Sequence, residues 1–388
     1  MQNNFKNLAI ISDCVHAYDR SKKVITENHI FCRQMQSLAS MFEHTVICCP
    51  FTRYSPDMVT TSYSNPDINF IALPLVGGNR LKDKLIILKT IPVWLKTFRK
   101  ISKNTDIVYQ RFPNNLNIPG FFFFWLIRKK TFATYTGTWK NYEGEPLTFR
   151  FQKWLLKNFF RGPVAAYITD NNIGKRIFKS FSPSYTLTEW EEETAQVNSR
   201  MERQENCPLH KPVFITVGAL VANKNQQYIL DAFKILHDEG FRFYLYVVGD
   251  GPLMYAYKQF IDKNNLQQSI TLTGNITYTD LRILYRRADF LIQATLAEGY
   301  GKAPLEGFFH GVIPFLSNTA MAKEMTGNNE RGFIFSTSQN NLANLIRDIT
   351  NQTAIIPGMI KCGRQYARQM TLENWTAACI KIVNEYYS

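Results

Sequence analysis

The sequence Glu298-Gly299-Tyr300-Gly301-Lys302-Ala303-Pro304-Leu305-Glu306 connects an apolar run at residues 288–294 to a helical pattern that stops at Gly311. This order predicts a buried strand, a glycine loop and the start of a helix. The unpaired backbone N–H groups and positive dipole end of a helix start suit an anion such as a diphosphate. The glycines let the backbone approach a ligand, and the glutamates can accept hydrogen bonds from sugar hydroxyls. Phosphate and hydroxyls together describe a nucleotide sugar.

Apolar runs alternate with amphipathic stretches on both sides of this loop. In the first half, strands are expected at 8–12, 45–49, 69–73, 106–110, 131–135 and 165–169, with helices at 27–42, 81–103 and 121–130. In the second half, strands are expected at 213–217, 243–248, 270–272, 288–294 and 313–316, with helices between them. Strands that alternate with helices indicate parallel, doubly wound sheets. The predicted fold class is therefore α/β, with two Rossmann-like doubly wound domains that face each other across a cleft.

A polar stretch without periodicity, residues 191–212, separates the two alternating series. It predicts the connection between the domains. The boundaries follow as a first domain at 1–195, a linker at 196–211, a second domain at 212–370 and a terminal helix at 371–388.

Composition limits the classes of protein that fit. The chain has 388 residues, of which 45% are hydrophobic, enough for two cores. The sequence has no uncharged run of eighteen apolar residues, so no membrane-spanning helix is predicted. The first residues do not resemble a secretory signal. The cysteines show no C-x-x-C spacing, which favours free thiols in a reducing cytoplasm. They are Cys14, Cys32, Cys48, Cys49, Cys207, Cys362 and Cys379.

Positive charge is concentrated in the first half of the chain. Residues 1–200 hold 27 Lys and Arg against 15 Asp and Glu, whereas the rest hold 18 against 16. Such a half favours an anionic partner: nucleic acid, a membrane surface or a phosphorylated substrate. No helix-turn-helix, zinc-finger or aromatic-basic sheet signature is present, so no nucleic-acid partner is predicted.

The order of motifs in the second half resembles the donor domain of retaining glycosyltransferases of the GT-B fold, in the large family 4. The motifs are Val217-Gly218 with Lys224 downstream, Val248–Pro252, Thr273-Gly274, Tyr285–Asp289, the glutamate pair, Gly311 and the stretch from Glu324 to Gly332. The first half resembles the family only in its pattern. The resemblance implies an acceptor site in the first domain, a donor site in the second and a last helix, around Trp375, that crosses back onto the first domain.

This resemblance assigns roles to residues of the glutamate loop and its neighbours. Glu298 corresponds to the catalytic glutamate near the transferred sugar, and Glu306 to the one that binds the ribose. The donor-binding residues it implies are Gly218, Lys224, Gly274, Asn275, Gly299, Tyr300, Gly301, Lys302 and Glu306.

One cation of the family is missing, because Ala219 stands where relatives have an arginine. Either Lys302 replaces it, or phosphate binding is weaker, or the donor lies differently. The sequence has no D-x-D triplet, so neither a metal nor a cofactor is expected beside the nucleotide diphosphate sugar, which is the substrate.

The acceptor side is less defined. Asp13, His16 and Arg111 follow predicted strands and are the candidates there. Thr136–Trp139 lies where many relatives carry a histidine, so no general base is named. In the family, the leaving phosphate can accept the proton of the acceptor.

A basic and apolar segment predicts a membrane-facing surface. Residues 81–130 hold eleven basic residues against two acids, interleaved with aliphatic side chains and the run Phe121–Trp125. This composition suits the interface of an anionic membrane. Alternatively, these helices pack their apolar faces on the first sheet and leave a solvated basic rim.

The predicted function is a retaining, metal-independent transfer of a sugar to a glycan or a polyprenyl-linked or other lipid-linked acceptor, in surface polysaccharide assembly. The predicted location is the cytoplasm, on the inner face of the plasma membrane. Two alternatives keep the fold: an inactive relative that binds nucleotide sugar or glycan as a scaffold, and an isomerase such as a sugar epimerase.

Overall fold

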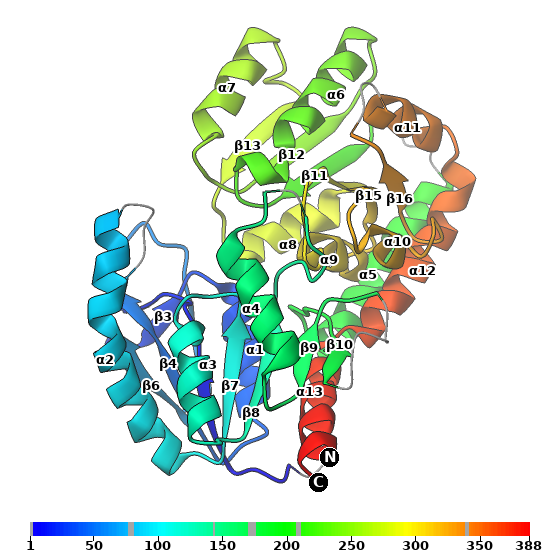
Figure 1. Ribbon diagram of the computed structural model, residues 1–388. Coiled ribbons are helices and arrows are strands. Elements are labelled where there is room, and N and C mark those ends of the chain that lie inside the picture. The colour runs from blue at the N-terminus through cyan, green and yellow to red at the C-terminus, as the bar shows by residue number, and fades with distance from the viewer. Residues whose placement is uncertain (1–2, 77–80, 143, 170–175, 207–210, 338–340) are drawn as a thin grey trace. The chain divides into compact units, whose positions relative to one another are not determined.

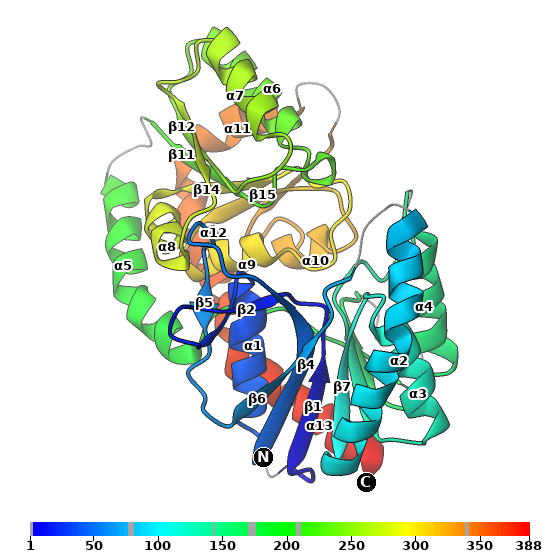
Figure 2. The same ribbon diagram turned by 90° about the vertical axis from the view of Figure 1, so that its left-hand side faces the viewer.

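The computed structural model describes residues 3–76, 81–142, 144–169, 176–206, 211–337 and 341–388. The chain forms two compact units (Figures 1 and 2). The first unit comprises Met1–Ser182 together with Leu372–Ser388, and the second comprises Pro183–Thr371. Cys207, one of the predicted free thiols, lies outside the described residues, and the other six cysteines are free.

The first unit is built on one mixed sheet whose strand order is β10-β9-β8-β7-β1-β4-β2-β3-β5, with β6 paired to β4. The strands are β1 (Asn7–Ile11), β2 (His16–Tyr18), β3 (Val24–Thr26), β4 (His44–Thr52), β5 (Thr61–Ser62), β6 (Ile68–Leu73), β7 (Ile107–Phe112), β8 (Thr131–Tyr135), β9 (Val164–Ala166) and β10 (Ile177–Lys179). All pairs are parallel except β2 with β3 and β3 with β5. The helices are α1 (His29–Ala39), α2 (Leu81–Asn104), α3 (Asn117–Leu126), α4 (Leu147–Asn158) and α13 (Leu372–Tyr387).

Strand β1 shows how the sheet is covered on both faces. Successive side chains of a strand point to opposite faces, so each strand contributes to two cores. Leu8 and Ile10 pack with residues of α1 and α13, including Trp375. Ala9 and Ile11 pack with residues of α2 and α3. The continuous apolar run of β1 is therefore typical of a buried parallel strand.

The second unit has a parallel sheet with the strand order β13-β12-β11-β14-β15-β16. The strands are β11 (Val213–Val217), β12 (Tyr244–Val248), β13 (Ile270–Gly274), β14 (Phe290–Gln293), β15 (Ile313–Ser317) and β16 (Phe333–Phe335). The helices are α5 (Leu187–Asn206), α6 (Gln226–Asp238), α7 (Met254–Lys263), α8 (Tyr278–Arg287), α9 (Lys302–Phe309), α10 (Ala322–Thr326), α11 (Asn341–Thr350) and α12 (Ile356–Gln369), with 3-10 turns η1 (Ala222–Lys224) and η2 (Thr353–Ile355). The strand order runs outward from β11 and then reverses to β14. Ligands of such sheets bind at the carboxyl ends of the strands where the order reverses.

Helix α5 corrects the predicted linker. Residues 187–206 form a helix of the second unit, and the division between the units falls after Ser182 and not at residue 195. Thr186 and Glu189 form a capping box, in which Thr186 Oγ1 accepts from the Glu189 amide at 3.1 Å and Glu189 Oε2 accepts from the Thr186 amide at 2.8 Å. The periodicity was hidden because the buried stripe of α5 includes the charged residues Glu193 and Arg200.

Two further features concern the ends and surfaces of the chain. Leu372–Ser388 groups with the first unit, and α13 packs beside α1 (Figure 2). Among the described residues, no helix combines the length and the apolarity that a membrane crossing requires.

We predict that Trp375→Ala lowers the free energy of unfolding by about 3–5 kcal/mol, because it removes a large side chain from the core between α13 and the sheet. Chemical denaturation measures this change. Trp154→Ala is the matched control, since the Trp154 side chain is 50% exposed and its loss should have little effect. Equal losses in both variants would contradict the role of α13 in the first core.

Candidate active site

An ion pair joins the loops that follow β11 and β14, the two strands between which the strand order reverses. Lys224 ends the η1 turn after β11, and Glu298 lies in the loop after β14. The Lys224 ammonium donates a hydrogen bond to Glu298 Oε2, which also accepts from Gln293 Nε2 at 3.1 Å. Both charged side chains keep about one fifth of their surface exposed, at 23% and 22%. The structure therefore brings together two residues that lie 74 positions apart in the sequence.

The loops that follow β11, β12 and β13 meet through their glycines. The Gly218 amide donates to the Val248 carbonyl and the Gly249 amide to the Gly274 carbonyl, each at 3.0 Å. Gly249 has φ +129°, and a Cβ there would lie 2.1 Å from the Gly218 carbonyl oxygen. A Cβ on Gly218 would touch the Lys224 side chain at 3.6 Å, so the stem of Lys224 passes over this glycine. Asn275 follows these loops and is exposed.

The glycine loop leads into α9 as the sequence predicts. Gly301 is the N-cap of α9, and its carbonyl accepts from the Leu305 amide at 3.3 Å. A Cβ on Gly301 would meet the Pro304 ring at 3.0 Å, so this position favours glycine. Tyr300 is buried, whereas Lys302 is half-buried at the helix start. The first amides of α9 lie beside the strand ends, where an anion gains most from a helix dipole.

Glu306 lies on α9 and is 6% exposed. Tyr285, on α8, donates its hydroxyl to Glu306 Oε2 at 3.3 Å and also contacts the Ala303 carbonyl at 3.3 Å. Burial and then the charge of Glu306 raise the pKa of Tyr285 well above its usual range, so the phenol stays a donor. The sequence placed Tyr285 in a motif of the resembling family but gave it no role in the site. In the structure its hydroxyl orients the Glu306 carboxylate.

A network centred on the buried Glu193 supports the contact between Tyr285 and Glu306. The Tyr285 ring stacks on the His310 ring with 5.2 Å between centroids, and His310 Nδ1 lies 2.8 Å from Glu193 Oε1. Glu193 also forms ion pairs with Arg286 at 2.6 Å and Arg282 at 3.3 Å. Burial raises the pKa of Glu193, but hydrogen bonds from Arg286 and His310 outweigh it and hold that pKa below its usual range. An ionised carboxylate only accepts, so Nδ1 carries the hydrogen.

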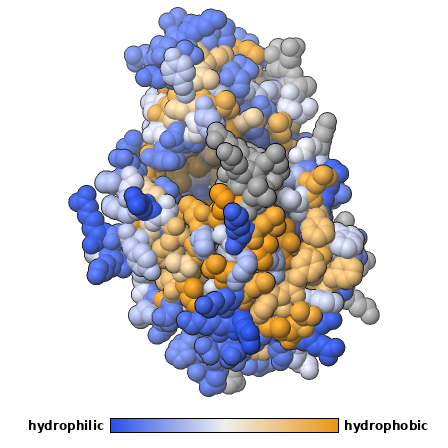
Figure 3. Space-filling view, turned by 60° about the vertical axis from the view of Figure 1, so that its left-hand side comes forward, coloured by the Kyte–Doolittle hydropathy of each residue, from blue (hydrophilic) through white to orange (hydrophobic). Residues whose placement is uncertain are grey.

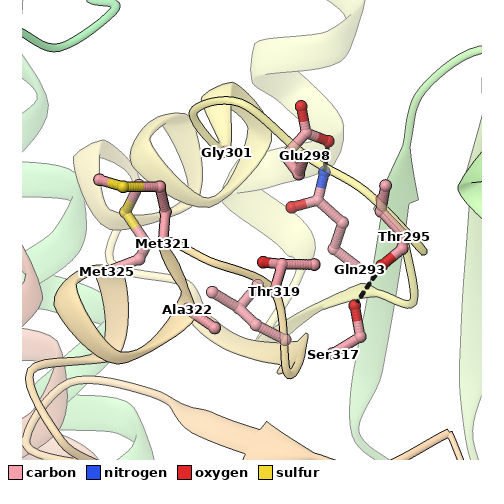
Figure 4. Close-up of a pocket in the computed structure, with 10 residues that line it drawn as sticks. Gln293, Thr295, Glu298, Gly301, Ser317, Thr319, Met321, Ala322 and Met325 are labelled. Atoms are coloured by element: carbon pink, nitrogen blue, oxygen red, sulfur yellow. Dashed lines mark hydrogen bonds between the residues drawn. The ribbon is translucent and has the colours of Figure 1, made fainter. Parts of the chain in front are cut away.

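A small pocket opens beside Glu298 in the second unit (Figure 4). Its lining residues come from the ends of β14 and β15 and from the segment that includes α10. They are Gln293, Thr295, Glu298, Gly301, Leu316, Ser317, Thr319, Met321, Ala322 and Met325. Ser317 donates to the Thr295 carbonyl at 2.6 Å and so ties the two strand ends together. The sequence predicted only Glu298 and Gly301 of this set.

The candidates in the first unit differ in their surroundings. Asp13 follows strand β1. Arg111 lies near the end of the neighbouring strand β7. Asp13 keeps an exposed surface, but neighbouring protein atoms displace part of its water shell and raise its pKa, and the charge of Arg111 opposes this shift. Arg111 is 9% exposed, donates to Gln34 Oε1 at 3.3 Å and lies over the Phe31 ring at 5.2 Å. The two candidates therefore share one edge of the first sheet.

The surroundings of His16 differ from those of Asp13 and Arg111. Its Nε2 contacts the Tyr63 hydroxyl and its Nδ1 the Cys14 carbonyl, both at 2.8 Å, so both ring nitrogens have partners. Burial lowers its pKa to about 4. Within the described part of the chain, no group of three or more His, Cys, Asp or Glu residues could hold a metal ion.

Comparison with known proteins finds similar sequences and folds. Residues 198–365 match the model of a family described as "Glycosyl transferases group 1". An uncharacterized glycosyltransferase of Methanocaldococcus jannaschii is 25% identical over 170 residues, 44% of this chain and 47% of the relative. The alpha-monoglucosyldiacylglycerol synthase of Streptococcus pneumoniae is 32% identical over 110 residues, 27% of this chain and 25% of the relative. The chain spans less than half the length of these relatives.

The fold of the whole chain is also similar to a solved structure. HepE of Anabaena, crystallised in complex with UDP and glucose, aligns with a TM-score of 0.71 at 14% identity, over 96% of this chain and 99% of HepE. The predicted α/β fold with two Rossmann-like domains is confirmed. Residues 198–365 therefore match the model of this glycosyltransferase family, and the similarity to HepE shows the fold of the whole chain.

We predict a pH dependence of stability from His310, whose pKa burial lowers to about 4 although Glu193 opposes the shift. Above pH 6.5 the imidazole is neutral in both the folded and the unfolded chain. Between 6.5 and about 4 the unfolded chain binds a proton that the folded chain does not, so stability falls as the pH falls.

Denaturation curves across this range should show a shallower loss of stability in His310→Gln than in the wild type. His16→Gln is the comparison, because the pKa of His16 is also about 4 and His16 should contribute its own share. A wild-type slope in His310→Gln would contradict a neutral, buried His310.

Proposed function

We propose that the chain transfers a sugar from a nucleoside diphosphate sugar to a hydroxyl of a glycan or lipid-linked acceptor, with retention at the anomeric carbon and without a metal. The observation that carries the proposal is the meeting of Lys224 and Glu298 beside the start of α9, where the strand order of the second sheet reverses. A cation and the positive end of a helix dipole suit a diphosphate, and carboxylates suit hydroxyls.

The donor's parts are assigned by the chemistry of each group. The diphosphate is bound by Lys224 and by the amides at the start of α9, next to Gly218. Glu306, oriented by Tyr285, accepts from the two ribose hydroxyls. HepE, a protein of similar fold, is crystallised with UDP and glucose, which supports this class of ligand.

The reaction places negative charge on the leaving diphosphate. A fixed cation and aligned amides stabilise that charge more in the transition state than in the bound donor. The Lys224 ammonium is held by Glu298 before the donor arrives, so the cation is already oriented. Lys302, at the first position of α9, supplies the second cation in place of the arginine that Ala219 replaces. Glu298 orients the sugar hydroxyls, and the leaving phosphate takes the acceptor's proton.

The acceptor that we propose is carried by a lipid, and the setting is the assembly of a surface polysaccharide or glycolipid at the inner face of the plasma membrane. The similar enzyme of Streptococcus pneumoniae is by its name a synthase of a glucosylated diacylglycerol, which supports a lipid acceptor. The basic first half of the chain supports an anionic membrane as partner.

We predict that one nucleotide sugar from a panel raises the melting temperature of the wild type, and that Glu306→Gln weakens its affinity about 10- to 100-fold, because a charged acceptor of two hydrogen bonds is lost. Thermal shift and titration calorimetry measure this. Glu330→Gln, at an exposed position of the same unit, is the matched control. Equal affinities in both variants would place the ribose elsewhere.

We predict that Glu298→Gln lowers the rate of transfer about 10²- to 10³-fold while the donor still binds, since the group acts mainly in the transition state. A coupled assay of nucleoside diphosphate release measures the rate, and NMR of the product gives the anomeric configuration. Full activity in EDTA is expected.

The alternatives give different results in the same assays. A wild type that binds the donor but neither transfers nor hydrolyses it would favour the scaffold. Conversion of the donor sugar without an acceptor would favour the isomerase, and an inverted product would contradict retention.

A further inference from the structure

Helices α3 and α4 of the first unit carry large apolar side chains on their outer faces. On α3, Phe121 and Phe124 are buried against the sheet, whereas Phe122 and Trp125 are exposed. The exposed set is Phe122, Trp125, Leu126, Ile127, Leu147, Phe151, Trp154 and Phe159, with Leu126 at 73% and Trp154 at 50% exposure. Figure 3 shows apolar side chains gathered over helices of the first unit. One face of α3 therefore packs in the core, and its other face exposes aromatic side chains.

A basic pocket adjoins this apolar surface at the ends of α3 and α4. It is lined by Arg128, Lys129, Lys130, Arg161 and Tyr387. The Tyr387 hydroxyl lies 2.7 and 2.9 Å from the carbonyl oxygens of Thr131 and Arg161, which share its one hydrogen, and it accepts from the Thr131 amide at 2.9 Å. These groups lie where β8 begins, at the edge of the sheet opposite to the strand ends that carry Asp13 and Arg111.

Arg161 joins the pocket to the apolar surface. The Arg161 guanidinium lies over the Trp125 ring at 4.3 Å from its centroid and donates to the Trp125 carbonyl at 3.2 Å. Lys129 donates to the carbonyls of Ser102 and Thr105, so its charge is partly used within the fold. Arg128, Lys130 and Arg161 are exposed and present their charges to the solvent.

The residues around this pocket carry mostly positive charge. Residues 117–161 contain eight Lys and Arg but only two acids, Glu143 and Glu145. Glu145 is buried and paired with Lys153 at 2.7 Å, and Glu143 lies outside the described residues. A cationic pocket beside exposed tryptophan, leucine and isoleucine matches the interface of a bilayer, where phosphates lie next to acyl chains.

We infer that this pocket binds the phosphate of an anionic phospholipid, while Trp125, Leu126 and Ile127 enter the headgroup and acyl boundary of the same leaflet. The inference deepens the membrane association proposed above and rests on it for its biological setting. It joins α3 and Arg128–Lys130 of the basic segment 81–130 to residues outside that segment, on α4, at Arg161 and at Tyr387 of α13. The site needs neither donor nor catalysis.

The test is sedimentation of the full chain with vesicles of phosphatidylcholine alone and of phosphatidylcholine mixed equally with phosphatidylglycerol. We expect binding to the mixed vesicles only. Each basic residue near a charged membrane contributes about a fivefold factor, so Arg128→Asn with Lys130→Gln should weaken binding about 25-fold. Asn suits position 128 because its φ is +55°. Lys258→Gln with Lys263→Gln, on exposed positions of α7, removes the same charge from the other unit and should have little effect.

The apolar half of the site has its own pair of variants. Trp125→Ser should weaken binding to mixed vesicles about tenfold, because the apolar area of the ring no longer leaves water. Tyr255→Ser is the control, since Tyr255 is an aromatic residue that is 71% exposed in the second unit.

Three results would overturn the lipid assignment. One is a loss of binding that is the same in the pocket variant and in the α7 variant. Another is unchanged binding in Trp125→Ser. The third is release from vesicles by inorganic phosphate, at an ionic strength matched with chloride, which would assign the pocket to a soluble phosphate. Thermal shift with the nucleotide sugar in the same variants separates this failure from that of the proposed function, because the donor site lies in the other unit.

Discussion

The pairing of Lys224 with Glu298 depends on one constraint, the reversal of strand order between β11 and β14. All strands of the second sheet are parallel, so their carboxyl ends lie at one edge. The helices that follow β11 and β14 diverge to opposite faces where the order reverses, and the loops between them can meet a ligand. Without this reversal, a lysine after the first strand of the unit and a glutamate after the fourth would not share an anion site.

The candidate site in the second unit is supported by one buried carboxylate, Glu193, and its partners. Glu193 is surrounded by Arg282, Arg286 and His310, and the His310 ring supports Tyr285, which in turn orients Glu306. An unpaired carboxylate at this depth would cost several kcal/mol, and the partners offset that cost. The network therefore holds the Glu306 carboxylate in place through a series of contacts that begins at Glu193 on α5.

The first unit uses the two ends of its sheet differently. At the carboxyl ends, Asp13 follows β1 and Arg111 lies near the end of the neighbouring strand β7. At the opposite end, Arg128 and Arg161 stand beside exposed aromatic side chains. This separation lets one small unit carry two kinds of chemistry, because α3 and α4 each run from one edge of the sheet to the other.

The sequence by itself determined the class of fold and the local framework of the donor site. Apolar runs of strand length, glycines after the strands and Pro304 in the first turn of a helix are local signals, and they located β14, the loop and α9. The sequence also singled out Lys224, Glu298 and Glu306. It did not show α5, because a buried Glu193 and Arg200 replace apolar residues in the helical stripe and look like solvated charges. Only the tertiary structure decided that Glu193 supports Tyr285 through His310, that His16 is a core residue, and that Arg161 stacks on Trp125. These contacts join residues far apart in the chain, and no local sequence pattern encodes which distant residue stabilises a buried charge.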